Sequence, residues 1–184
     1  MRYKQIKKYI KSDCYRYIGK CDFFSMFIFY IKSSLFRWHV AFRMCHGKSF
    51  VKIIGLFLWL INKHRKDIVI SRHLKVGYGL HLGHGGPIVV NHSVIIGNNC
   101  NFSQFVSIGS NFGKGAIIND NVYVGPNVSI VENVNIGNNS TIGAGSVVTK
   151  DVPDNATVAG NYAKVLNYNN PGRFIKNKWD LNRK

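Results

Sequence analysis

Acidic residues are scarce in this sequence, which holds 8 Asp and Glu against 25 Lys and Arg and carries a formal net charge of +17 at pH 7. The imbalance is concentrated at the start, because residues 1–66 contain fifteen of the basic residues and only two of the acidic ones. Such a charge favours an acidic partner: a membrane surface, a phosphorylated substrate or nucleic acid. No nucleic-acid-reading motif accompanies the charge, so we predict no nucleic-acid partner.

Cysteine and long apolar runs are also scarce. The four cysteines show neither CxxC pairs nor zinc spacing, so free thiols in a reducing cytoplasm are expected. The apolar run 50–61 has 12 residues and contains Lys52, whereas a membrane-spanning helix needs about 20 apolar residues. The basic start, 1–11, leads into no apolar region with a cleavage site, so no signal peptide is expected. We therefore predict a cytoplasmic protein, with a peripheral position on the inner membrane face left open.

What the sequence does contain is a period of six. An apolar residue returns at every sixth position, with one break: Val90, Ile96, Phe102, Ile108, then Ile118, Val124, Ile130, Ile136, Ile142 and Val148. The fourth position of these hexads reads Ser93, Asn99, Phe105, Asn121, Asn127, Asn133, Asn139, Gly145 and Asp151. Seven of these nine are Asn, Gly or Asp, which adopt a left-handed backbone most readily. The two periods predict a mainly β protein, a parallel β-helix of short strands and tight corners. A sandwich would space its turns every 8–12 residues.

The N-terminal region, 1–66, is expected to be α-helical. Residues 2–20 show helical spacing, and 23–31 and 50–61 are aromatic and apolar. These helices either pack on themselves and on the β-helix, or present a basic, aromatic surface to an anionic membrane. The two interpretations are compatible, and both stay open.

The remaining chain divides around the repeat. We expect the β-helix domain to occupy 67–160, with a loop at 110–116 where four extra residues break the count. A basic tail follows over 161–184. Within this tail, 173–181 is expected to form a short helix or to be partly disordered.

Two stretches carry a resemblance to a known family. Residues 142–153 read Ile-Gly-Ala-Gly-Ser-Val-Val-Thr-Lys-Asp-Val-Pro, with Val-Ala-Gly at 158–160 and Ala-Lys-Val at 163–165, and closely resemble the C-terminal end of hexapeptide-repeat acyltransferases. Residues 77–90 read Gly-x-Gly-Leu-x-x-Gly-His-x-Gly-x-Ile-Val-Val. This pattern resembles the subgroup related to serine O-acetyltransferases, which includes enzymes that acetylate sugars of bacterial O-antigens and capsules. The resemblance implies a left-handed parallel β-helix, a homotrimer with sites between subunits, and acetyl-CoA as the donor.

Acyl transfer from a thioester to a hydroxyl needs a base for the hydroxyl proton and donors for the tetrahedral oxyanion. A neutral histidine suits the first task, because its ordinary pKa lies near neutral pH. Among the seven histidines, only His84 has the Gly-His-x-Gly setting that matches the family's catalytic base. It lies beside a slip of the six-residue register at Gly85-Gly86, although position alone also allows a structural role at a corner. His81 and His92 are the reserve candidates.

The same resemblance identifies substrate positions. The family's serine enzymes carry an acidic residue directly before the base, where this chain has Gly83, and Gly86 belongs to the same motif. They also carry an upstream Asp that orients the base. The matching position here is Val69, so Asp67, two residues away, is the candidate, and a backbone carbonyl is the alternative. The loop at 110–116 lacks the Arg and His that the serine enzymes have in theirs.

The donor positions also come from the resemblance. The family's pantetheine arm passes small residues of the later coils, which match Gly125, Ala144 and Gly145 here. Basic positions near the CoA phosphates match Lys150 and Lys164. A turn requirement alone also accounts for glycine in such corners, and exposed lysines are commonly just solvated.

Without an acidic residue at Gly83 and without Arg or His in the loop at 110–116, a zwitterionic serine would lack partners for its two charged ends, and desolvating it unpaired would be costly. We therefore predict an acetyl-CoA-dependent O-acetyltransferase acting on a sugar of a bacterial surface polysaccharide, O-antigen or capsule, or its precursor, in lipopolysaccharide biosynthesis. The alternatives are a small-metabolite acceptor, serine-like or xenobiotic, and a non-catalytic β-helix binding module. No metal is predicted, because His81, His84 and His92 lack the spacing of a γ-carbonic-anhydrase-like site.

Overall fold

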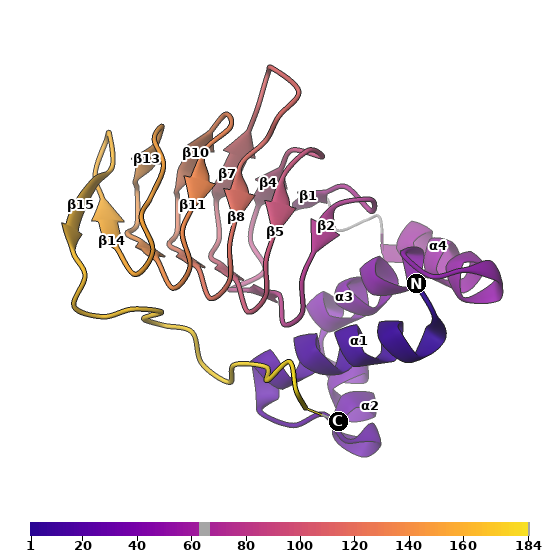
Figure 1. Cartoon of the computed structure of the whole chain (residues 1–184). Helices are drawn as coiled ribbons and strands as arrows, with labels where there is room; N and C mark the ends of the chain where they lie inside the picture. The colour runs from indigo at the N-terminus through magenta and orange to yellow at the C-terminus, as the bar shows by residue number, and fades with distance from the viewer. Residues whose placement is uncertain (63–66, 184) are drawn as a thin grey trace.

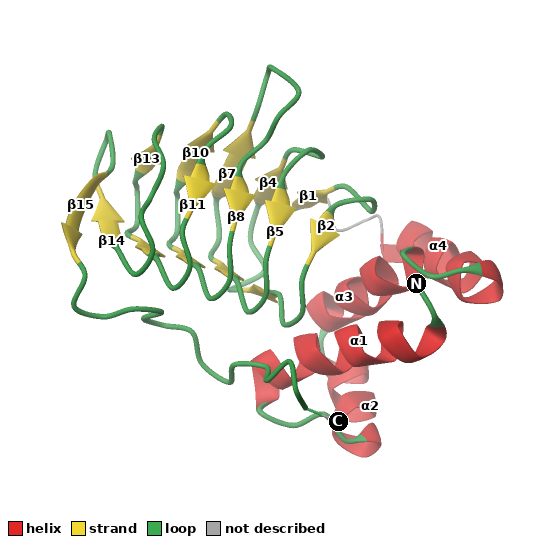
Figure 2. Cartoon of the chain, in the orientation of Figure 1, coloured by secondary structure: helices red, strands yellow, loops and turns green. Residues whose placement is uncertain are grey.

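The computed structural model describes residues 1–62 and 67–183, and within them four helices precede fifteen short strands. The helices are α1 (Tyr3–Ile18), α2 (Phe23–Lys32), α3 (Ser34–Cys45) and α4 (Ser49–Asn62). Figure 1 and Figure 2 show them gathered at one end of a stack of β-coils. No helix in the described part of the chain is long and apolar enough to cross a membrane.

Three sheets form the sides of the stack. Sheet A holds β1 (Ile68–Ile70), β4 (Ile88–Val90), β7 (Val106–Gly109), β10 (Ser129–Val131) and β13 (Val147–Val148). Sheet B holds β2 (Lys75–Val76), β5 (Ile95–Ile96), β8 (Ile117–Ile118) and β11 (Asn135–Ile136). Sheet C holds β3 (His81–Leu82), β6 (Asn101–Phe102), β9 (Tyr123–Val124), β12 (Thr141–Ile142), β14 (Thr157–Ala159) and β15 (Lys164–Asn167). Strands of successive coils pair in parallel, and only the last pair, β14 with β15, is antiparallel within the described residues. The predicted parallel β-helix with a helical N-terminal region is confirmed.

The predicted apolar ladder is the core of this stack. The ten residues of the first hexad position are each at most 4% exposed. Their register is direct, since Val90 lies opposite Ile108 and Ile96 opposite Ile118 in neighbouring coils. Stacked β-branched side chains fill the narrow interior, and their removal from water is the main favourable contribution to folding.

The corners follow the second period in part. Six of the nine predicted positions have a left-handed backbone: Asn99, Phe105, Asn121, Asn127, Asn139 and Gly145. The three exceptions, Ser93, Asn133 and Asp151, all follow sheet-A strands. At one of these corners the Asn91 side chain accepts a hydrogen bond from the Ser93 amide at 2.9 Å. At another, Glu132 takes the left-handed conformation in place of Asn133, with φ of 63°. The corner after sheet A therefore uses a different turn.

The C-terminal tail runs back from the far end of the stack to the helices (Figure 1). The predicted alternative of a short helix over 173–181 is wrong, because this segment is turns and extended chain. The Trp179 amide donates to Asn99 Oδ1 at 2.8 Å, and Asn99 Nδ2 donates to the Trp179 carbonyl at 3.1 Å. Backbone groups that a helix would pair internally are instead bonded to a β-helix corner.

The helices are joined to the first coil by a buried ion pair. Arg43 of α3 donates to both carboxylate oxygens of Asp13 in α1, at 2.7 and 2.9 Å. Arg43 also donates to the carbonyls of Val76 and Gly77, at 2.9 and 2.7 Å. The Leu80 amide donates to Asp13 Oδ1 at 2.9 Å. These bonds fix α1 and α3 directly beside β3, where the predicted catalytic residue follows.

Candidate active site

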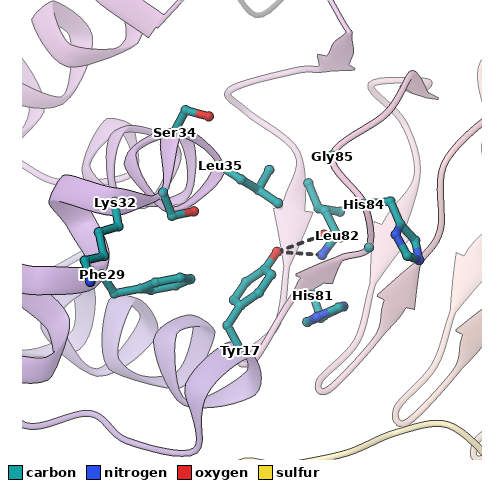
Figure 3. A pocket seen from close by; sticks show the side chains of 11 residues that line it. Tyr17, Phe29, Lys32, Ser34, Leu35, His81, Leu82, His84 and Gly85 are labelled. Carbon is teal, nitrogen blue, oxygen red and sulfur yellow. Dashed lines mark hydrogen bonds between the residues drawn. The ribbon is translucent and has the colours of Figure 1, made fainter.

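A cavity of about 590 Å³ lies between the helices and the corner after β3 (Figure 3). Its lining residues are Tyr17, Phe29, Lys32, Ser33, Ser34, Leu35, His81, Leu82, Gly83, His84 and Gly85. One wall is therefore the predicted Gly-His-Gly turn, and the other comes from α1, α2 and the start of α3. The turn that carries the predicted catalytic residue thus forms one side of the cavity, and the helices enclose it from the other side.

The turn that carries His84 has two consecutive left-handed residues. His84 has φ of 61° and Gly85 has φ of 60°. Such a conformation is unfavourable for a residue with a side chain, and it is often found at functional sites. The imidazole is exposed and has no hydrogen-bond partner among the described residues. In Figure 3 the ring lies on the β-helix side of the cavity, across the strand from Tyr17.

Tyr17 clamps the strand that leads into this turn. The Leu82 amide donates to Tyr17 Oη at 2.8 Å, and Oη lies 3.1 Å from the Leu82 carbonyl oxygen (Figure 3). Oη also lies 2.9 Å from His39 Nε2, and His39 Nδ1 lies 3.4 Å from Asp13 Oδ2. A chain of polar contacts thus runs from the buried ion pair to the backbone two residues before His84. It holds the turn in place from the helical side.

The two reserve histidines have surroundings that differ from those of His84, although His81 lines the same cavity. His81 stacks on Tyr17 with 4.4 Å between ring centroids. Burial, together with the charge of Arg16, lowers the pKa of His81 to about 4, so its ring is a much weaker proton acceptor than an ordinary histidine. His92 is exposed on the corner after β4, on another edge of the stack.

Corners that follow sheet-C strands stack along one edge of the β-helix, here named the His84 edge. His84 follows β3, Gly125 follows β9, and Ala144 and Gly145 follow β12. Bonds between coils hold this column, such as the Gly145 amide donating to the Pro126 carbonyl at 2.9 Å. With about 4.8 Å between coils, Ala144 stands roughly 15 Å along the edge from His84. Four predicted site residues therefore share one edge.

The small residues on the His84 edge are small for different structural reasons. A Cβ on Gly125 would lie 2.8 Å from the Ile142 carbonyl oxygen, so packing between coils requires glycine there. Gly145 is left-handed, with φ of 69°, and a Cβ there would meet nothing within 4 Å. The surface above Gly145 and Ala144 is open, and a ligand can approach the backbone closely at this point.

The other predicted residues lie apart from the cavity. Lys150 is exposed on the corner after β13, away from the His84 edge, and Lys164 is exposed at the start of β15 in sheet C. Gly86 follows the cavity turn, and a Cβ on it would come within 2.8 Å of Gln104 Cβ. Asp67 does not line the cavity; its carbonyl accepts from the Ile88 amide at 2.8 Å, one coil below. Within one chain, neither Lys150 nor Lys164 lines the cavity that His84 borders.

Sequence patterns missed the helical wall. Tyr17 comes from α1, Lys32 from α2, and Ser34 and Leu35 from α3. The patterns place α3 within the helical region 1–66 but do not single it out, since its buried face includes His39 and Arg43 among apolar residues and so lacks a clean stripe. No local motif marks these side chains, because only long-range packing brings them to the site.

Comparison with known proteins supports the family. The six-repeat bacterial transferase hexapeptide model matches residues 115–150. Serine acetyltransferase 3, a mitochondrial protein of Arabidopsis thaliana, is 39% identical over 122 residues, which are 62% of this chain and 30% of that protein. The serine acetyltransferase of Synechococcus elongatus is 36% identical over 138 residues, 71% of this chain and 56% of that protein. The chain thus spans less than two thirds of the length of these curated relatives.

Solved structures agree. Neisseria gonorrhoeae serine acetyltransferase in complex with serine is 32% identical and superposes with a TM-score of 0.67, covering 88% of this chain and 69% of that one. Soybean serine acetyltransferase without ligand is 26% identical, with a TM-score of 0.70, covering 89% of this chain and 69% of that one. The match extends over the helices as well as the coils.

These comparisons correct one prediction. The assignment of a sugar acceptor, in an O-antigen or capsule, is wrong, because the relatives are serine acetyltransferases. The prediction counted Gly83, and the absence of Arg and His from the loop at 110–116, against serine. The structure adds Lys32 of α2 to the same cavity, a cation that the repeat could not reveal.

The fold and the family membership now rest on independent observations. The coils reproduce the predicted ladder, and the helices cover the turn that carries His84. Identity above 30% extends across 69% of a solved serine acetyltransferase. With its left-handed parallel β-helix, the chain belongs to the hexapeptide-repeat acyltransferase family.

Proposed function

We propose that the protein is an acetyl-CoA-dependent O-acetyltransferase that acetylates the hydroxyl of a small metabolite, with L-serine as the first acceptor to test. The observation that carries the proposal is the position of His84. It borders the cavity and shares an edge with Gly125, Ala144 and Gly145. The serine acetyltransferases among the relatives support the reaction class and the acceptor.

In the proposed reaction His84 is the general base. Its neutral imidazole accepts the acceptor's hydroxyl proton as that oxygen bonds to the thioester carbonyl carbon. The tetrahedral intermediate then collapses, the carbon–sulfur bond breaks, and the imidazolium returns its proton to the CoA sulfur. An exposed ring without a partner among the described residues keeps a nitrogen lone pair free for this transfer.

We assign the donor to the His84 edge. A thioester arm along this edge passes Gly125, Ala144 and Gly145, where small residues let it approach the backbone. Lys164, exposed on sheet C, is the nearer candidate for the CoA phosphates. Lys150 is on a different edge, so it would reach CoA only across a subunit boundary of the homotrimer that the family resemblance implies.

The acceptor belongs in the cavity beside His84. Lys32 supplies a positive charge for a carboxylate, and Tyr17 and Phe29 supply apolar surface. Gly83 has no side chain that could bind the ammonium group of serine, so this group would have to be bound by oxygen atoms of other residues. Gly86 shapes the turn, and Asp67 stays a predicted positioning residue from the coil below.

Thiol release from acetyl-CoA tests the proposal, with L-serine and a panel of other small hydroxyl compounds as acceptors. His84→Asn should lower kcat about 100- to 10,000-fold, since this is the usual contribution of a general base. His92→Asn, an exposed histidine on another edge, is the matched control and should keep the wild-type rate. Full activity of the His84 variant would refute the assigned base, and no thiol release with any acceptor would favour the binding-module alternative.

A further inference from the structure

Helix α4 turns an apolar face to solvent. Phe50, Ile53, Phe57, Leu60 and Ile61 are 54–71% exposed. Their spacing of three, four, three and one residues puts them on one side of the helix. Such a stripe normally packs on a protein core, and here no described residue buries it.

The opposite side of α4 is fixed against α3. A Cβ on Gly55 would lie 2.5 Å from the Met44 carbonyl carbon and 2.6 Å from the Cys45 amide nitrogen. This close backbone approach admits only glycine. Because Gly55 lies roughly opposite Ile53 and Phe57 around the helix, the apolar face is held outward and cannot rotate inward.

Helix α2 has the same arrangement. Phe23, Phe24, Phe27, Ile28 and Ile31 are 36–86% exposed and share one side of the helix. On the other side, Phe29 stacks on Phe36 with 4.9 Å between ring centroids. The Asp22 side chain accepts from the Ser25 amide at 2.9 Å and caps the helix start. Two helices thus expose ten large apolar side chains, far more than the scattered surface residues of an ordinary protein.

The charge around these faces is positive. Residues 1–62 contain twelve Lys and Arg and only two acids, of which Asp13 is buried in its ion pair and Asp22 caps α2. Lys20 lies just before α2, and Lys48 and Lys52 lie just before and in the first turn of α4. Two copies meeting through these faces would bring like charges together. An anionic bilayer offers both an apolar interior and the opposite charge.

We propose that the apolar faces of α2 and α4 dock the protein on an anionic lipid bilayer, with the helices lying in the membrane interface. Neither helix spans the bilayer, since α4 has 14 residues and α2 has 10. The aromatic side chains enter the acyl boundary, and the flanking lysines meet the headgroups. This docking is independent of the acetyl transfer proposed above.

Co-sedimentation of the full chain with vesicles tests the docking. Phosphatidylglycerol–phosphatidylcholine vesicles should bind the wild type, and pure phosphatidylcholine vesicles should bind it much less. The double variants Ile53→Ser/Phe57→Ser and Phe23→Ser/Phe27→Ser should each weaken binding by about tenfold or more, because each removes two large apolar groups from the contact. Phe112→Ser is the control, since Phe112 is 87% exposed on the β-helix loop and outside both faces.

Circular dichroism and thiol release without vesicles show whether each variant is folded, since none of these side chains lines the cavity. Binding to both vesicle types with equal strength, no binding at all, or unchanged binding of both double variants would overturn the proposal. A double variant that lowers the mass of the assembly in solution would instead show that a second copy covers these faces. Loss of acetyl transfer would leave the vesicle result intact, so the two proposals fail separately.

Discussion

Two adjacent left-handed residues hold the His84 ring at its place on the edge of the cavity. A left-handed backbone costs roughly 1–2 kcal/mol for a residue with a side chain. The bonds around the turn offset that cost. The Gly83 amide donates to the Phe102 carbonyl at 2.6 Å, and Tyr17 clamps Leu82 just before it. The backbone therefore positions the proposed base before any substrate arrives, which is what general-base catalysis requires.

Gly83 offers the sharpest test of how the acceptor is read. A Cβ there would lie 3.5 Å from the Phe102 carbonyl oxygen, an ordinary contact, so a side chain fits. We predict that Gly83→Asp lowers KM for L-serine about tenfold or more, because a new carboxylate beside His84 pairs with the ammonium group. Steady-state thiol-release kinetics measure the change.

Gly83→Asn is the matched control, with the same shape and no charge. It should leave KM for serine within about twofold of the wild-type value, since a neutral amide contributes less to an ammonium contact. A KM that is unchanged in the Asp variant, while the protein stays folded, would mean that the acceptor carries no ammonium group at this side of the cavity.

At the residue scale the sequence marked the part of the candidate site that the repeat encodes. His84, Gly125, Ala144 and Gly145 were predicted because motifs fix their hexad positions, and the structure puts all four on one edge, while their roles stay a prediction. Lys32 was not found, because its place depends on how α2 packs. A side chain 51 positions before Gly83 gives no local signal for that contact.

Among the elements, α1 and α3 depend most on a polar contact. Asp13 and Arg43 are at most 1% exposed, and their two hydrogen bonds join the helices. Burial raises the pKa of Asp13, but the charge of Arg43 and hydrogen bonds from His39 and Arg43 outweigh it, so the pKa lies below its ordinary value. The carboxylate is charged at neutral pH and needs its partner.

Removing the partner should therefore be costly. We predict that Arg43→Met lowers the free energy of unfolding at pH 7 by about 3–5 kcal/mol, because it leaves a buried charge unpaired. Urea denaturation followed by circular dichroism measures the change. Arg37→Met is the control on the same helix: among the described residues Arg37 donates to the carbonyls of Tyr30 and Ile31, and its loss should cost about 1 kcal/mol.

The pH dependence gives a second readout of the same pair. Since the pKa of Asp13 is lower in the folded state, its contribution to stability is present above the unfolded value of about 3.9 and is lost as pH falls toward the folded pKa. The difference in stability between wild type and Arg43→Met should therefore narrow from pH 7 to about pH 3. A constant difference would show that the lost stability comes from packing and not from the charge.

Over the whole molecule, what the sequence reveals depends on the range of the contacts. The coils repeat a local pattern, so the ladder and most corners were predictable from every sixth residue. The tail is fixed by contacts such as Trp179 with Asn99, which are 80 positions apart, and no period marks them. The helices likewise gain their arrangement from the buried pair and from the first coil.

The outer faces of sheets A and B also carry exposed apolar side chains. Val69, Val89 and Val131 on sheet A, and Ile95 and Ile117 on sheet B, are 39–55% exposed. A ring with threefold symmetry joins two different patches of each chain, so a sheet-A face of one copy can meet a sheet-B face of the next. This arrangement supports the proposed homotrimer, and it would bring Lys150 near a neighbouring copy.

Light scattering on the purified protein should give three times the 20.8 kDa mass of one chain. We predict that Ile95→Lys/Ile117→Lys reduces this to the mass of one chain, because stacked like charges in sheet B would have to be buried unpaired in the contact. Val165→Lys, at a 42% exposed valine of sheet C, should leave the mass unchanged. A wild type that measures 20.8 kDa would rule out the trimer, and a sheet-B variant that stays trimeric would move the interface to another face.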